Sequence, residues 1–214
     1  MIYIVGIGPG SPEYIIPLAV DTMKKVDVII GFERAMTSIP KINVQNIIVK
    51  TLKDIIDYIT INNHKDIAII ASGDPCFYGI TNYIKSNFDG KVEIIPGISS
   101  FQYLMCKLQK PWQNAHLGSM HGRREEFIKV VGEYEISVWL TDKGNSPQAL
   151  CRKLFDNNIK ATIYVGEELS YTDERIIKGT VEEFKDKIFN NLSVVVIENM
   201  ESSTEYISEI MHRK

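Results

Sequence analysis

Residues 2–12 read IYIVGIGPGSP, an apolar run that leads into a segment with three glycines and two prolines. The run predicts a buried strand at Ile2–Gly6, and glycines that follow a strand are typical of a tight turn. Apolar residues at helical spacing place a helix over residues 17–26. A strand, a glycine turn and a helix together form the first unit of an α/β fold.

The same alternation continues through the first half of the chain and then changes. Further strands are predicted at residues 28–31, 46–49, 67–71 and 92–95, with a helix at 52–61, so the sheet is mainly parallel. The polar, proline-containing segment 109–114 fits a linker. Beyond it the pattern is mixed α/β with antiparallel pairs: strands at 115–119, 136–141, 161–165, 175–178 and 192–197, and helices at 124–131 and 147–155. We therefore predict two α/β domains, residues 1–111 and 112–214.

Composition argues against several classes of function. The 214 residues carry a net charge of −3, which gives no electrostatic footprint for nucleic acid. No apolar run approaches the length of a membrane span, and no signal peptide is expected. Cys76, Cys106 and Cys151 are dispersed, which argues against a disulfide framework or a metal site and favours a cytoplasmic protein.

The opening glycines are a poor nucleotide fingerprint. A dinucleotide site needs glycine at three positions, and here Gly6 and Gly8 are followed by Ser11. Pro9 also removes a backbone N–H that a phosphate cradle would use. We interpret the loop as a tight turn.

Two more turns follow predicted strands: residues 70–79, IASGDPCFYG, and residues 94–100, IIPGISS. Open α/β sheets bind ligands at the carboxyl ends of their strands. Two interpretations stay open. Asp74 caps a helix that begins at Pro75, or it contacts a ligand; Ser99 and Ser100 cap the next helix, or they contact a ligand. The three turns lack lysines, which suits a ligand with adenosine and amino-acid ends and no phosphate.

The segments GIGPGSP, ASGDPCFYG, IPGISS, VWLTDKGNSP and YVGEELSYTDERIIKGT, in this order, resemble the tetrapyrrole (corrin/porphyrin) methylase family over nearly the whole chain. The resemblance implies two α/β domains with S-adenosylmethionine (SAM) in the cleft between them and S-adenosylhomocysteine as product. It implies cofactor contacts from Gly73, Asp74, Phe77, Ser99, Ser100, Leu140, Thr141, Gly166 and Leu169. It also implies that Gly8, Pro9 and Gly10 face the trough for the tetrapyrrole substrate.

The segments SPEYIIPLA, GFERAM, PGISSFQYLM and SMHGR resemble the branch that methylates carbon 5 of a precorrin, with or without cobalt, in cobalamin biosynthesis. The substrate's carboxylates need cationic partners, for which the candidates are Arg34, Arg123 and Arg124. His121 is the candidate for assisting proton loss. Solvated charges are the alternative for these residues. A homodimer, and association with a C15-methylating, decarboxylating enzyme, follow from the resemblance alone.

Other functions stay open beside this one. Within the family they are methylation at another ring position and diphthine synthesis; a ribosomal RNA methylase fits the acidic chain less well. Outside it, a nucleotide-binding module or a dehydrogenase would use the opening glycines. Trp139 is expected to pack in a core, and Glu167 to be solvated or capping.

Overall fold

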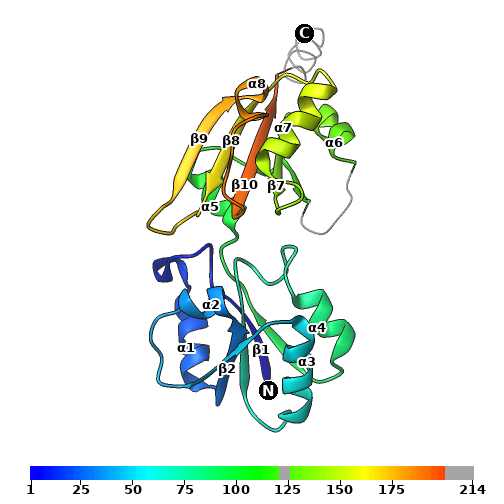
Figure 1. Ribbon diagram of the computed structural model, residues 1–214. Coiled ribbons are helices and arrows are strands. Elements are labelled where there is room, and N and C mark those ends of the chain that lie inside the picture. The colour runs from blue at the N-terminus through cyan, green and yellow to red at the C-terminus, as the bar shows by residue number, and fades with distance from the viewer. Residues whose placement is uncertain (121–125, 201–214) are drawn as a thin grey trace, which may run out of the picture. The chain divides into compact units, whose positions relative to one another are not determined.

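The computed structural model describes residues 1–120 and 126–200 of the chain, which forms two compact units (Figure 1). The predicted α/β class with two sheets is confirmed. The division between the units falls after Tyr103, inside helix α5 (Ser100–Lys107), and the expected boundary between residues 111 and 112 follows shortly after that helix. No helix in the described parts is long and apolar enough to cross a membrane.

The first unit contains a five-stranded sheet in the order β3-β2-β4-β1-β5, and every neighbouring pair is parallel. Its strands are β1 (Ile2–Gly6), β2 (Val28–Phe32), β3 (Gln45–Val49), β4 (Ile67–Ala71) and β5 (Val92–Ile95). The helices are α1 (Pro17–Lys25), α2 (Glu33–Thr37), α3 (Leu52–Ile61) and α4 (Thr81–Asn87), with a 3₁₀ turn at Pro12–Tyr14. The predicted strands of this half are therefore confirmed.

Helices cover both faces of this sheet (Figure 1). On one face Val5 packs in a cluster with Met23 of α1, and on the other Ile4 packs in a cluster with Ile55 of α3. Because both faces are covered, the central strands read as continuous apolar runs rather than as alternating ones. This explains why apolar runs alone located them.

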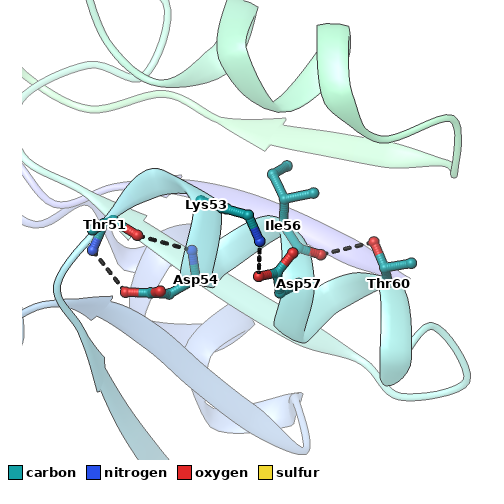
Figure 2. A network of polar contacts seen from close by, with 6 residues as sticks. All are labelled: Thr51, Lys53, Asp54, Ile56, Asp57 and Thr60. Carbon is teal, nitrogen blue, oxygen red and sulfur yellow. Dashed lines mark hydrogen bonds and ion pairs between the residues drawn. The ribbon is translucent and has the colours of Figure 1, made fainter.

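Helix α3 shows how local side chains fix an element's start (Figure 2). The Thr51 hydroxyl accepts a hydrogen bond from the Asp54 N–H, and the Asp54 carboxylate accepts one from the Thr51 N–H, at 3.1 and 2.8 Å. This reciprocal capping box satisfies donors that the first helical turn leaves open. Farther along, Lys53 pairs with Asp57 one turn away, and the Thr60 hydroxyl bonds to the Ile56 carbonyl.

The second unit contains a mixed sheet in the order β6-β7-β10-β8-β9, in which only β6 and β7 pair in parallel among the described strands. Trp139 is fully buried in its core, as expected, and donates to the Ser137 hydroxyl. The strands are β6 (His116–Ser119), β7 (Ile136–Leu140), β8 (Ala161–Glu167), β9 (Arg175–Thr180) and β10 (Ser193–Asn199). The helices are α6 (Phe127–Glu133), α7 (Pro147–Asp156) and α8 (Val181–Phe184).

Candidate active site

The strand order of the first unit creates a switch point between β1 and β4. The chain leaves β1 for β2 on one side and leaves β4 for β5 on the other, and such crossovers are right-handed. They therefore run over opposite faces: α1 packs in one core cluster and α4 in the other. Ligands of open α/β sheets bind where neighbouring strands send their connections to opposite faces.

The turns after β1 and β4 are joined by their backbones at this point. The Gly8 N–H donates to the Gly73 carbonyl at 3.3 Å, and the Gly73 N–H donates to the Gly8 carbonyl at 2.8 Å. Both residues have positive φ, 77° and 68°, which glycine adopts without strain. Since each N–H is engaged by the other turn, neither is open to a phosphate, in keeping with a tight turn.

The turn after β5 lies against the other two with no side chain between them. A Cβ on Gly97 would lie 2.2 Å from the Gly73 carbonyl oxygen and 2.9 Å from the Gly6 Cα. A Cβ on Gly6 would lie 2.6 Å from the Gly97 nitrogen. The three turns that the sequence singled out therefore meet in one place, which we call the glycine junction (Gly6, Gly8, Gly73 and Gly97).

Asp74 does not cap a helix, so that interpretation was wrong. Helix α4 begins only at Thr81, and the Asp74 carboxylate instead accepts the N–H of Cys76 at 2.8 Å and that of Gly97 at 3.1 Å. Proline is common at the first position of a helix, but the residues after Pro75 form an irregular turn instead. The side chain binds two turns instead of one helix end.

Ser99 carries a polar group without a visible role in the fold. Its side chain is 3% exposed, and its hydroxyl oxygen has no hydrogen-bond partner among the described residues. The interpretation that this hydroxyl caps α5 is therefore wrong. The Ser99 backbone N–H donates to Gln102 Oε1 at 2.9 Å. Buried polar groups are nearly always paired, so an orphan hydroxyl beside Gly73 fits a site that a ligand completes.

The structure also describes the remaining candidates of the first unit. Ser100 is the first residue of α5, and the Phe77 ring packs on Phe101 with centroids 4.5 Å apart. Gly10 is buried and Pro9 half-buried in the opening loop. Arg34 lies exposed on α2, and no ion pair is found for it among the described residues.

The candidates in the second unit take part in packing and hydrogen bonding within that unit. Thr141 is buried and its hydroxyl donates to the Ser193 carbonyl at 2.7 Å. A Cβ on Gly166 would lie 2.7 Å from Leu169 Cδ2, the end of a flexible side chain that would have to shift. Leu140 ends β7 and is half-buried. His121, Arg123 and Arg124 lie outside the described residues.

The expectation that Glu167 is solvated was wrong. It is 3% exposed, and its two oxygens accept hydrogen bonds from Arg175 Nε and from the Asn190 N–H, both at 2.6 Å. This pairing raises the pKa of the Arg175 guanidinium. Because both partners come from later segments, local sequence carries no signal for it.

No cluster of three or more metal-ligating side chains was found among residues 1–120 and 126–200. At the glycine junction the structure brings together closely approaching backbone and the unpaired hydroxyl of Ser99, and the turn after β4 also carries the ring of Phe77. These features fit the adenosine and amino-acid parts of SAM, which need backbone approach and neutral polar contacts rather than phosphate-binding cations.

Comparison with known proteins agrees with this arrangement. The family model of tetrapyrrole (corrin/porphyrin) methylases matches residues 1–185. The probable cobalt-precorrin-7 C(5)-methyltransferase of Methanocaldococcus jannaschii is 32% identical over 94% of this chain and 99% of its own. Two solved structures share the fold. The precorrin-6Y methylase of Archaeoglobus fulgidus is 21% identical, with a TM-score of 0.76 and coverage of 93% and 98%. The Thermus thermophilus uroporphyrin-III C-methyltransferase, complexed with S-adenosylhomocysteine, is 19% identical, with a TM-score of 0.75 and coverage of 92% of this chain and 96% of its own. The chain therefore belongs to the tetrapyrrole methylase family.

Proposed function

We propose that this protein transfers a methyl group from SAM to carbon 5 of cobalt-precorrin-7 in cobalamin biosynthesis. The family membership and the 32% identity to the probable C(5)-methyltransferase of M. jannaschii support the reaction. The buried, unpaired hydroxyl of Ser99 at the glycine junction is the structural observation that carries it. SAM, when bound, supplies a methyl group on a sulfonium and leaves as S-adenosylhomocysteine.

The chain's own part in this chemistry is to bind and orient. Ser99 would donate to or accept from a polar edge of SAM, and Gly73 would let it approach the backbone. Phe77, already fixed against Phe101, offers a ring face for the adenine. Holding two reactants in line can contribute roughly 7–11 kcal/mol, so no protein nucleophile is required.

The further assignments follow from the family resemblance. Ser100, Leu140, Thr141, Gly166 and Leu169 would complete the SAM contacts, and Asp74 belongs to the loop that binds SAM. Gly8, Pro9, Gly10, Arg34, Arg123 and Arg124 would contact the tetrapyrrole and its carboxylates, and His121 would assist proton loss. We also propose that the protein is cytoplasmic, with domains at residues 1–111 and 112–214. It would form a homodimer, which light scattering would test, and would associate with a C15-methylating partner.

Two buried serines make a matched test of the SAM site. Ser99→Ala removes a hydroxyl without a partner, so the free protein should be no less stable while S-adenosylhomocysteine binds several-fold more weakly. Ser137→Ala leaves the Trp139 Nε1–H unpaired, so stability should fall by about 1–3 kcal/mol with unchanged affinity. Titration calorimetry and urea unfolding measure the two effects.

The outcome also separates the alternatives. Labelled SAM with candidate tetrapyrroles should label carbon 5 of cobalt-precorrin-7. Label at another ring position, or on elongation factor, would move the protein to another branch of the family. A wild-type protein that binds NAD and not S-adenosylhomocysteine would refute the methylase function itself.

A further inference from the structure

The Asp74 carboxylate bridges two turns that lie 23 residues apart in sequence. One oxygen accepts the N–H of Cys76, in its own turn, and the other accepts the N–H of Gly97, in the turn after β5. We propose that Asp74 is a positioning residue: it holds the third turn against the second, and it affects SAM binding through Gly97 and Ser99 rather than through its own contact. This inference rests on the proposed function.

The backbone provides no substitute for this bridge. Backbone hydrogen bonds join the first turn to the second, at Gly8 and Gly73, whereas none joins residues 71–74 to residues 96–99, all of which the structure describes. The second and third turns touch through Gly73 and Gly97, where no side chain intervenes. The hydrogen bond from Gly97 to a charged acceptor is therefore the directional tie between them, and bonds of this kind are the stronger ones.

The bridge lies directly before the orphan hydroxyl. Ser99 follows Gly97 by two residues, and its Cα lies 3.6 Å from the position of a Cβ on Gly73. Its N–H is fixed by Gln102 in the first turn of α5. A shift of Gly97 would therefore move the Ser99 hydroxyl relative to Gly73, and small misplacements of binding groups weaken ligand binding and catalysis.

Asp54 offers a control with the same chemistry at another place. Its carboxylate also accepts two backbone N–H groups, that of Thr51 at 2.8 Å (Figure 2) and that of Lys50 at 3.1 Å. Both of these donors belong to one helix start, so no second turn depends on them. Asp54→Asn and Asp74→Asn thus make the same chemical change and the same loss of charge. At Asp54 both N–H groups bond to Oδ2 within one helix start, whereas at Asp74 the two oxygens join two different turns.

Two variants of Asp74 separate the bridge from the local turn. Asp74→Asn keeps the size of the side chain but directs an NH₂ group at one of the two N–H donors. Asp74→Ser keeps an acceptor for Cys76 and is too short to reach Gly97, so it removes only the bridge. The two readouts are S-adenosylhomocysteine affinity by calorimetry and amide hydrogen exchange of the ligand-free protein.

We expect both Asp74 variants to bind S-adenosylhomocysteine about tenfold more weakly or worse, with faster exchange at Gly97 and Ser99. Asp54→Asn should speed exchange only around residues 50–54 and leave the affinity within about twofold. Weaker binding with unchanged exchange at Gly97 would show that Asp74 contacts the ligand directly and would overturn the inference. Faster exchange at Gly97 with unchanged affinity would show that the bridge does not affect binding, and would also overturn it. If the wild type binds no S-adenosylhomocysteine, the proposed function fails, and the role assigned here fails with it whatever the exchange shows.

Discussion

Gly97→Ala is the most direct test of the glycine junction. The added Cβ would lie 2.2 Å from the Gly73 carbonyl oxygen, which is 0.8 Å less than the 3.0 Å below which real Cβ contacts are essentially never found. Two Gly6 backbone atoms lie 2.9 Å away. Because all these neighbours are backbone, no side chain can rotate to relieve the contact, and the turns after β1, β4 and β5 must separate.

The geometry sets the expected size of the effect. Overpacking of this kind costs about 1–3 kcal/mol of stability, measured as a lower urea midpoint. A separation of the turns on the order of 1 Å should reduce kcat/KM for methyl transfer on the order of 100-fold, because bound reactants must be held in line. Affinity for S-adenosylhomocysteine should fall with it.

Gly132→Ala is the matched control. Gly132 lies in α6, and a Cβ there would meet nothing within 4 Å. The substitution should raise stability by about 0.5–1 kcal/mol, since alanine favours a helix over glycine, and should leave activity unchanged. A Gly97→Ala protein with wild-type stability and turnover would refute the close packing inferred here.

Two further predictions concern titrating groups. Hydrogen bonds from Thr51 lower the pKa of Asp54 in the folded protein. The stability that this carboxylate provides is therefore complete above the pKa of an unfolded aspartate, about 3.9, and is lost as pH falls through the lower pKa of the folded state. The stability difference between wild type and Asp54→Asn should therefore shrink between pH 7 and pH 3 in urea unfolding; a constant difference would contradict this. Burial raises the pKa of the Cys151 thiol to about 12, whereas Cys76 and Cys106 are exposed. A thiol reagent at pH 8 should label two cysteines quickly and the third only on unfolding, and three fast labels would disprove the burial.

Local sequence was sufficient for most of the elements. The predicted central strands of the first unit match the structure because strands covered on both faces must be apolar throughout. In the structure the Thr180 hydroxyl and the Glu183 carboxylate form a capping box at the start of α8, and its two hydrogen bonds lie within four residues, so local sequence is sufficient for it as well. Capping of a helix that begins at Pro75, one of the two interpretations left open for Asp74, is wrong, and its carboxylate instead bonds to Cys76 in its own turn and to Gly97 in a distant one.

The sequence by itself thus determined the α/β class, the three glycine turns and the resemblance to a methylase family. Only the tertiary structure decided that these turns meet, because the strand order that places β4 and β5 on either side of β1 is not encoded in any single segment. It likewise decided the burial of Glu167 and the bridge from Asp74 to Gly97, whose partners come from distant parts of the chain. Hydrogen bonds and close contacts across such separations depend on how the chain folds back, so residue type and spacing could not reveal them.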